Sequence, residues 1–419
     1  MDVRRSMSKN KSIVIIGAGI IGLSSALWLQ KSGYKVTIID RKKPGEGTSF
    51  GNAGVLAGFA RLPFTRFSML GKIPKMLLDQ TSPLSISAGY IPSMCPYAWQ
   101  YFRSCFRYPK GREALTQIQS KAFESDQVLL NMTGGKSFVH SEGSLALLAD
   151  PESIKKIREG EMLERQNHGV NLSFCNASQI YEMEPSLAPF YAGGIYYPDT
   201  RFTVSPIQLS RCYAEYFKAN GGIIIEDEVH SIKTTNSAVE VQLSDATQYF
   251  DHLVIAAGTA SKKLVKQLKV NVPLVSERGY HLMIDSNTST PLKRPIAWLD
   301  KSIFMSPIES QIRLAGTAEF ADIDAPPVQR RIDNLKNVAK TMLGREIEVT
   351  SEWLGSRPST PDSLPMIGNL PSQPKVTVAF GHGHLGLTLS AITGRLVSEI
   401  IEGKEPSVDL TAFSPLRFN

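Results

Sequence analysis

The sequence predicts an α/β fold in which a domain built on a parallel sheet is interrupted by a second, α+β domain. Near the amino end an apolar strand, a glycine-rich turn and a helical pattern follow one another, and the same succession returns near the carboxy end. Between them lies a long stretch in which prolines and aromatic residues break this pattern. With 419 residues, of which 42% are hydrophobic, the chain is long enough to bury two cores.

The amino end predicts a strand, a helix and a second strand. The run SIVIIG at 12–17 is apolar and β-branched, a helical pattern extends from about Ile20 to Ser32, and KVTIID at 35–40 is again typical of a strand. Gly33 lies where a helix end favours a left-handed residue. Because both strands are mostly apolar, we expect them in a parallel sheet that is covered on both faces.

The middle of the chain predicts the interruption and the return. Between about Leu62 and Pro109, prolines at 63, 74, 83, 92, 96 and 109 indicate an irregular insertion. Alternating helix and strand patterns return with a helix expected from about Pro206 to Asn220, followed by the strands GGIIIEDEV and HLVIAAG. We therefore expect two interleaved domains. The first comprises 1–70, 201–262 and 352–419, and the second comprises 71–200 and 263–351.

The glycine turn after the first strand indicates a dinucleotide site. Gly17, Gly19 and Gly22 have the spacing G-x-G-x-x-G between a strand and a helix. Such glycines permit a tight turn, close approach of a pyrophosphate and helix packing, and the helix N-terminus attracts the anion. Asp40 ends the next strand, where a carboxylate can hold ribose hydroxyls. The alternative for the glycines is a purely structural turn. Arg41 follows Asp40 directly and could contact a 2′-phosphate, or its side chain could simply be solvated.

A second turn with the same spacing lies near the carboxy end. Gly381, Gly383 and Gly386 follow an apolar strand and precede a helical pattern, so we expect a second helix N-terminus to point into the same crevice. A nicotinamide dinucleotide has no use for this second turn. A flavin does, because reduction leaves negative charge on its N1 and C2=O edge. The two turns together predict FAD; the alternative is an ordinary helix start with permissive glycines.

Small residues cluster directly after the second strand. The run GEGTSFGNAGVLAG at 45–58 is rich in glycine and small polar side chains. Such a segment lets the backbone pass close to a flat ring, and Thr48, Ser49 and Asn52 can donate hydrogen bonds to it. Its position after Asp40 favours a cofactor-binding loop over the alternative, a flexible surface loop.

One arginine near the carboxy end is a candidate for substrate binding. Arg357 lies in GSRPSTPDSLPMIG, where prolines restrict the backbone, and a rigid mount suits bidentate capture of a carboxylate. The alternative is a surface ion pair. Tyr280 and His281 in SERGYHL are candidates for lining the pocket, with strand packing as the alternative. His382 and His384 have no third ligand at suitable spacing, so we expect no metal.

Composition limits the partners and the compartment. The chain has 46 basic and 39 acidic residues, a net charge of +7, which favours anionic small molecules or an anionic membrane surface. No basic run interleaves with aromatic residues, so we expect no nucleic-acid partner. Four cysteines without disulfide or metal spacing favour the cytoplasm. The basic amino end and the uncharged stretch at 12–30 could pass for a signal peptide, but the stretch divides into strand, turn and helix.

Several pieces of the sequence resemble the D-amino-acid oxidase group of glutathione-reductase-type flavoproteins. They are IVIIGAGIIG, GTSFGNAG, VIAAG, RGYHL, RLAGTAEF, RPSTPDSLPMIG and GHGHLGLTLSAITGRL. The chain is most similar to the bacterial D-amino-acid dehydrogenase and D-hydroxyproline dehydrogenase branch. The resemblance implies a Rossmann-like FAD domain interrupted by a mainly antiparallel substrate domain. It extends the expected cofactor contacts to these residues: Ile20, Ile21, Ala53, Gly54, Val229, Ala257, Gly258, His384, Leu385, Leu387 and Thr388.

The resemblance also implies an activity. Arg357 falls where members of the group hold the substrate carboxylate, and the expected reaction is oxidative deamination of a small amino acid, a D-amino acid or D-hydroxyproline-like compound, by hydride transfer from Cα to flavin N5. The alternative is an oxidase of secondary amines such as sarcosine. His384 stands where glycine-oxidising members have a second arginine, and Phe304 stands near a tyrosine of the oxidases, so substrate specificity cannot be transferred directly.

The partners implied by the resemblance are a small amino-acid substrate and an electron acceptor, which is left open among a quinone, an electron-transfer protein and oxygen. The region from Leu62 to Pro109 is similar to the part of dehydrogenase relatives that approaches a membrane or a quinone, so peripheral contact with the inner face of the cell membrane is a hypothesis. The last cysteine, Cys212, precedes the flavin-facing carboxy-terminal segments, and we therefore expect non-covalent FAD.

Overall fold

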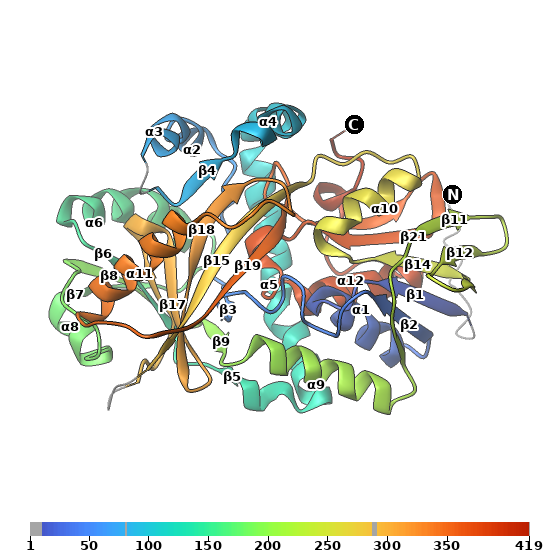
Figure 1. The fold of residues 1–419 in the computed structure, drawn as a ribbon, viewed down its shortest axis with the longest axis horizontal. Coiled ribbons are helices and arrows are strands. Elements are labelled where there is room, and N and C mark those ends of the chain that lie inside the picture. The colour runs from blue at the N-terminus through green and yellow to red at the C-terminus, as the bar shows by residue number, and fades with distance from the viewer. Residues whose placement is uncertain (1–10, 80–81, 287–290, 419) are drawn as a thin grey trace.

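The computed structural model describes residues 11–79, 82–286 and 291–418. Arg4, Arg5 and Lys9 of the basic amino end lie outside these ranges. Two large sheets lie side by side, the one that starts at the amino end on the right in Figure 1 and a larger one on the left. Both helices and strands are present in each half, as the α/β prediction requires.

The right-hand sheet has six strands, and its members come from three distant parts of the chain. Neighbouring strands are parallel except at the edge, where β20 runs antiparallel to β21. In sheet order the strands are β10 (Ile223–Glu226), β2 (Lys35–Asp40), β1 (Ser12–Ile16), β14 (His252–Ile255), β21 (Gln373–Phe380) and β20 (Met366–Leu370). The expected parallel sheet is confirmed, and it joins the two ends of the chain.

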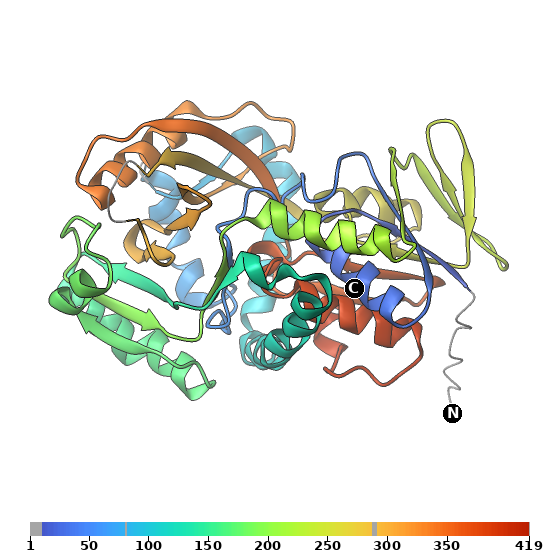
Figure 2. The ribbon, with the colours of Figure 1, turned by 90° about the horizontal axis from the view of Figure 1, so that it is seen from below.

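Different layers cover the two faces of this sheet. Side chains alternate along β1, so that Ile13 and Ile15 face one layer while Val14 and Ile16 face the other. The first layer is helical, and Figure 2 shows its members from below: α1 (Ile20–Lys31), α5 (Tyr108–Thr133), α9 (Pro206–Ala219) and α12 (Ser390–Ile401). The second layer is mostly strand: β11 (Ser231–Thr234), β12 (Val239–Gln242), β13 (Thr247–Phe250) and the helix α10 (Ser261–Gln267).

The left-hand sheet has nine strands and is mainly antiparallel. Only the β6–β16 and β4–β18 pairs are parallel among its described pairs. Its path is β19 (Val349–Ser359), β15 (Val275–Asp285), β18 (Gln311–Phe320), β17 (Ile303–Ile308), β16 (Ile296–Trp298), β6 (Ser144–Leu148), β8 (Gly193–Tyr197) and β7 (Ser173–Asn176), with β4 (Leu84–Ile86) beside β18. The strand directions confirm the expected, mainly antiparallel sheet. The helix α11 (Gln329–Leu343) covers one face of β15 and β18.

The proline-rich range is more regular than we expect from its sequence. Several prolines open helices, because a first-turn proline has no intrahelical N–H to lose: Pro74, Pro92 and Pro109 all lie in such turns. The remaining helices and short strands are α2 (Phe67–Leu70), α3 (Ile73–Leu78), α4 (Ile91–Cys105), α6 (Pro151–Ile157), α7 (Leu163–Asn167), α8 (Ala177–Met183), β3 (Val55–Leu56), β5 (Val139–His140) and β9 (Arg201–Thr203).

Two elements bear on the domain ranges. The helix α5, which lies within 71–200, packs with α12 through Leu115 and Ile118 and so adjoins the six-stranded sheet. The strand β19 begins at Val349, three residues before the boundary at 352, and belongs to the nine-stranded sheet. The small sheet of β3, β9 and β5 lies near both halves. The discontinuous division stays a proposal, and its boundaries are better drawn around these elements.

Candidate active site

The first glycine turn leaves no room for side chains at two positions. Gly17 has φ +115°, and a Cβ there would lie 2.4 Å from the carbonyl oxygen of Ala256. A Cβ on Gly22 would lie 1.9 Å from the carbonyl oxygen of Gly17, so α1 packs directly on the turn. Gly19 is the N-cap of α1 and supplies no side-chain capping bond. Bare backbone at a helix N-terminus whose N-cap residue has no side chain is what a pyrophosphate requires.

Side chains from two later segments fix this turn. The carboxylate of Asp40 accepts from Ala18 N at 2.7 Å and from Lys42 N at 3.0 Å, so part of it is occupied by the backbone. Ser49 Oγ accepts from the N–H of Ile20, the first residue of α1, at 2.9 Å. Ile21 follows on the first turn of α1, and Arg41 is exposed next to Asp40.

The loop at 48–54 is held by residues of the nine-stranded sheet. Thr48 Oγ1 donates to the carbonyl of Ser356 at 2.6 Å. Arg313 Nη1 donates to the carbonyls of Phe50 and Asn52, both at 2.8 Å. Within the loop, Asn52 Oδ1 accepts from Gly54 N at 2.7 Å, and Ala53 lies between them. The segment that we expect to pass the flavin is therefore an ordered loop, contrary to the alternative of a flexible one.

The second turn brings its backbone close to β19. Gly381 has φ +82° and Gly383 has φ +51°, conformations that favour glycine. His382 is buried between them and bonds to Thr393 Oγ1 at 2.9 Å, and burial lowers the pKa of His382 to about 3. The expected helix does not start at this turn: a short 3₁₀ segment, Gly383–Leu385, and further turn residues including Leu387 come first, and α12 begins at Ser390.

Other expected cofactor contacts lie around the same crevice. Ala257 and Gly258 follow β14, and Ala257 Cα is 3.0 Å from the position of a Cβ on Gly17. Val229 follows β10 and is half-buried against the core under the sheet. Thr388 Oγ1 accepts from Ala57 N at 2.9 Å, which ties the second turn to the loop region. These residues fit an extended dinucleotide, with a pyrophosphate at α1 and a flavin between the two turns.

An ion cluster lies where the second turn meets the nine-stranded sheet. Glu277 of β15 is directly opposite Arg357 of β19, and its Oε1 accepts from Arg357 Nη1 at 3.2 Å. His384 Nε2 lies 2.9 Å from the same oxygen, and Ser359 Oγ donates to Oε2 at 2.7 Å. Burial alone would raise the pKa of Glu277, but His384, Arg357 and Ser359 together lower it to about 2. Glu277 is therefore an anion at neutral pH.

Arg357 is held in one orientation. Its Nη1 also donates to the carbonyl of Thr317 at 2.9 Å, and its guanidinium lies over Gly279, where a Cβ would be 2.2 Å from Nη2. Thr317 has φ +67°, a strained conformation for a β-branched residue, at the bulge where β15 shifts register against β18. Backbone strain of this kind concentrates at functional sites. One-fifth of the Arg357 side chain is exposed, which leaves it accessible to a ligand.

The structure separates Tyr280 from His281. Successive residues of a strand point to opposite faces, so Tyr280 lies under α11, where its hydroxyl donates to Glu319 Oε2 at 2.8 Å. His281 faces the loop, with its Nδ1 3.2 Å from the carbonyl oxygen of Gly51 and its ring stacked on Trp353 at 5.1 Å. Tyr280 as a pocket-lining residue is corrected to a core residue, and His281 supports the loop.

Sequence reasoning missed residues that the structure places at the site. Glu277 and Arg313 are charged side chains within buried strands, and each has less than one-tenth of its surface exposed. Trp353 fills the space above Gly51, where a Cβ would lie 1.8 Å from its ring. Both strands also contain other polar residues, such as Arg278 and Glu319, so their sequences contain no distinctive signal for these two residues. Nothing in the spacing pointed to Trp353.

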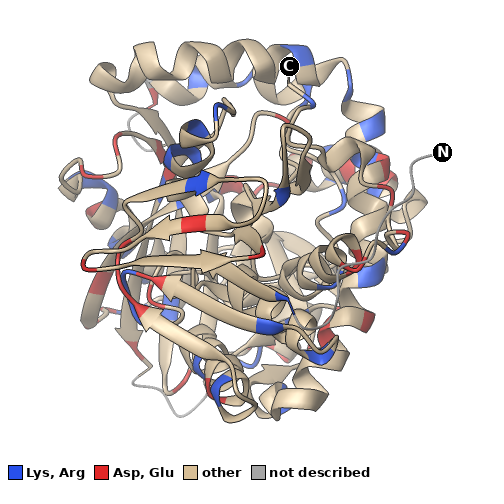
Figure 3. Ribbon diagram, turned by 90° about the vertical axis from the view of Figure 1, so that its right-hand side faces the viewer, with Lys and Arg blue, Asp and Glu red and all other residues tan. Residues whose placement is uncertain are grey.

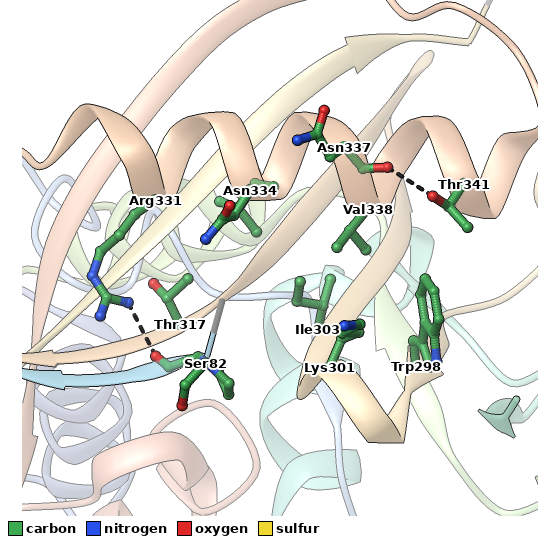
Figure 4. A pocket seen from close by; sticks show the side chains of 12 residues that line it. Ser82, Trp298, Lys301, Ile303, Thr317, Arg331, Asn334, Asn337, Val338 and Thr341 are labelled. Atoms are coloured by element: carbon green, nitrogen blue, oxygen red, sulfur yellow. Dashed lines mark hydrogen bonds between the residues drawn. The ribbon is translucent and has the colours of Figure 1, made fainter. Parts of the chain in front are cut away.

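A hollow of about 230 Å³ lies on the other face of the nine-stranded sheet. It is bounded by α11, β17 and β18, and Figure 4 shows Arg331, Asn334 and Lys301 at its wall. Arg357, Glu277 and His384 do not line it. The hollow is therefore separate from the cluster beside the glycine turns.

Comparison with known proteins agrees with the geometry. The chain belongs to the family of FAD dependent oxidoreductases called DAO, whose model matches residues 12–400. It is 32% identical to a D-amino-acid oxidase of Bradyrhizobium diazoefficiens, over 98% of this chain and 100% of that protein. It is 26% identical to a D-amino acid dehydrogenase of Vibrio atlanticus, over 94% and 97%. Glycine oxidase from Geobacillus kaustophilus has a similar fold, with a TM-score of 0.75 and 22% identity over 97% and 99%.

The cofactor of the protein is FAD, in agreement with the two-turn prediction. Within 11–79, 82–286 and 291–418, no group of three or more His, Cys, Asp or Glu side chains is placed to hold a metal ion. None of the helices in these ranges combines the length and the apolar character of a membrane span. Figure 3 shows basic and acidic residues interspersed at the end of the molecule that carries the six-stranded sheet.

Proposed function

We propose that this protein catalyses the FAD-dependent oxidative deamination of a small amino acid, a D-amino acid or a D-hydroxyproline-like compound. The observation that carries the proposal is the position of Arg357, which is fixed on β19 of the nine-stranded sheet, beside the second glycine turn. The two hydrogen bonds that it donates to residues the structure describes both use Nη1, so the other N–H groups can bind a carboxylate in two contacts. The D-amino-acid enzymes among its relatives support the same substrate class.

A bound FAD would supply the oxidant for removal of a hydride from the substrate Cα, and the imino acid so formed would be hydrolysed by water. The residues of this chain provide binding and orientation. Gly17, Gly19 and the α1 N-terminus are proposed to hold the pyrophosphate, Asp40 the ribose, and the 48–54 loop with Gly381 and Gly383 the ring. Arg313, His281 and Trp353 keep that loop in place. A fixed carboxylate contact then positions Cα, which is how orientation contributes to the rate.

The substrate class is tested by steady-state assays with an artificial electron acceptor and a panel of D- and L-amino acids, hydroxyprolines and sarcosine. We expect ammonia and a keto acid from a D-amino acid, or a cyclic imine from D-hydroxyproline. Turnover confined to sarcosine would favour the secondary-amine oxidase instead. Mixing the reduced enzyme with oxygen tests whether oxygen is the electron acceptor. Slow reoxidation is expected for a dehydrogenase, and fast formation of peroxide would show an oxidase instead.

An aromatic surface on α2 and α4 supports contact with a membrane that carries the acceptor. Phe67, Trp99, Phe102 and Phe106 are all exposed, and their rings contact one another. These helices lie at the top of Figure 1. Five basic residues in the same stretch of chain are also exposed: Lys72, Lys75, Arg103, Arg107 and Lys110. Apolar rings amid positive charges suit the interface of an anionic bilayer.

This surface adjoins the ion cluster through one residue. The ring of Phe64 lies 5.3 Å from that of His384, and Tyr101 of α4 donates to the carbonyl of Phe64 at 3.2 Å. We expect the protein to bind vesicles that contain anionic lipid, and Phe106→Ala with Trp99→Ala to weaken the binding. Tyr249→Ala, at an exposed tyrosine of β13, is the matched control. Equal vesicle binding by all variants would place the contact elsewhere, or show that none exists.

A further inference from the structure

The carboxylate of Glu277 lies beside Arg357, and the proposed function gives it no part. Its side chain is 7% exposed, and it is held by three groups from two elements: Arg357 and Ser359 on β19 and His384 on the second turn. A carboxylate has about four acceptor positions, and three are used here. Because burial opposes ionisation, this charge persists only through such partners, and it is unusual for a carboxylate to neighbour an arginine that must bind a substrate anion.

The pair presents one positive and one negative charge side by side. Glu277 and Arg357 are direct cross-strand neighbours, and both extend from the face of the sheet that meets the second glycine turn. Two of the Arg357 contacts pass through Nη1, while Nη2 lies over the bare backbone of Gly279. The ammonium and carboxylate of an α-amino acid are also adjacent, because both are attached to Cα. The two patterns are complementary.

We propose that Glu277 and Arg357 together form a clamp for the amino-acid zwitterion, in which Arg357 binds the carboxylate and Glu277 binds the amine. The inference rests on the proposed function and specifies its substrate class. Arg357 alone would attract any carboxylate, including 2-hydroxy acids. Glu277 offsets that charge, so a plain carboxylate gains little, whereas an added ammonium group recovers the lost attraction.

His384 has a defined place in this clamp. Its side chain is 43% exposed, and its imidazole N–H faces the same Glu277 oxygen that Arg357 contacts. A charged carboxylate only accepts hydrogen bonds, so the imidazole is the donor. It satisfies Glu277 from the solvent side of the cluster, where an amine donor can replace it or join it. The unliganded site thus keeps its buried anion paired.

The test compares D-alanine with propionate, which differ only in the amine. Binding is measured by calorimetry on enzyme that has been reduced beforehand with dithionite, because the reduced enzyme cannot oxidise the amino acid. We expect Glu277→Gln to weaken the binding of D-alanine by about tenfold or more and to strengthen the binding of propionate. The preference for D-alanine over propionate should therefore fall by up to about 100-fold. Equal weakening of both ligands would overturn the clamp, because it would show that Glu277 only holds Arg357 in place.

Two further variants keep the test decisive. Glu319→Gln removes a buried carboxylate from the opposite face of the same sheet, where it accepts from Tyr280, and should leave the preference unchanged. If Glu277→Gln does not fold, Glu277→Asp takes its place in the test, because it keeps the charge but shortens the side chain. Its preference for D-alanine should lie below that of the wild type, and a wild-type preference would contradict the clamp. If the wild type oxidises no amino acid yet shows the predicted switch, the proposed function fails and the clamp stands.

Discussion

The two glycine turns share a spacing in the sequence but differ in what each glycine does. In the first turn the third glycine, Gly22, is the most constrained, because a Cβ there would lie 1.9 Å from a carbonyl oxygen. In the second turn the third glycine, Gly386, has φ −55°, and a Cβ there would approach only His382 Cβ, at 3.8 Å. The helix starts within the first turn but four residues after the second.

This difference shows that spacing identifies a turn without identifying its essential residues. The first turn needs small residues because a helix packs on it, as a pyrophosphate site requires. The second turn needs glycine only at Gly381 and Gly383, where the backbone is left-handed. In the second turn the atom nearest to a Cβ on Gly386 belongs to the buried side chain of His382, and among the described residues no helix packs there as α1 packs on the first turn.

The largest expected effect is that of Gly22→Ala. The added methyl group would force α1 away from β1, at a cost of about 3 kcal/mol of unfolding free energy, and should abolish FAD binding. Flavin content after purification and urea unfolding measure both effects. Gly160→Ala is the control, since Gly160 is exposed and a Cβ there would meet no atom within 4 Å. Normal flavin content in Gly22→Ala would show that the first turn is not the pyrophosphate site.

Arg357→Lys should separate substrate binding from both turns. Lysine keeps the charge but loses the bidentate geometry, so we expect the KM for the amino acid to rise by about 10- to 100-fold while FAD stays bound. Steady-state kinetics and flavin absorbance make the comparison. An unchanged KM would remove Arg357 from the substrate site, and loss of FAD would show that the residue supports the cofactor instead.

Acidification should destabilise the protein through two buried histidines, His382 in the second turn and His281 beside the 48–54 loop. Burial lowers the pKa of His382 to about 3 and, with the charge of Arg313, that of His281 to about 3, below the usual value of 6.5. These histidines therefore contribute stability that is full above about pH 6.5 and is lost as the pH falls toward 3, by up to about 1.4 kcal/mol per pH unit for each. Urea unfolding between pH 7 and 4.5 measures the slope, and His382→Asn should reduce it. A flat profile contradicts this account.

The smallest expected effect is that of Gly386→Ala. Its backbone is already helical and has space for a methyl group, so the variant should bind FAD normally and gain up to about 1 kcal/mol of stability. Thermal unfolding of the holoenzyme detects the change. Flavin loss as large as that of Gly22→Ala would mean that the two turns are equivalent, which the structure contradicts.

Local patterns predicted the parts of the fold that depend on neighbouring residues. The strands at 12–16 and 35–40, both glycine turns and the parallel sheet follow from apolar runs and glycine spacing within short windows. Contacts across the chain were not predictable in this way. The pairing of Glu277 with Arg357 depends on strand register, and the hold of Arg313 on the 48–54 loop joins residues about 260 positions apart.

The same limit explains the errors at the site. Tyr280 and His281 are adjacent in sequence, but only the known faces of β15 show that they point in opposite directions. The insertion at 62–109 was expected to be irregular because prolines break helices, yet three of its six prolines occupy first turns, where no hydrogen bond is lost, and Pro96 is accommodated inside α4.

The central claim, that one FAD bound by both turns oxidises an amino acid held by Arg357, is tested most directly by anaerobic mixing of the yellow holoenzyme with D-amino acids and their L-enantiomers. The account predicts that at least one D-amino acid or D-hydroxyproline bleaches the flavin in a single turnover, and that Arg357→Lys needs a much higher concentration for the same rate. Flavin that stays oxidised with every amino acid would contradict it.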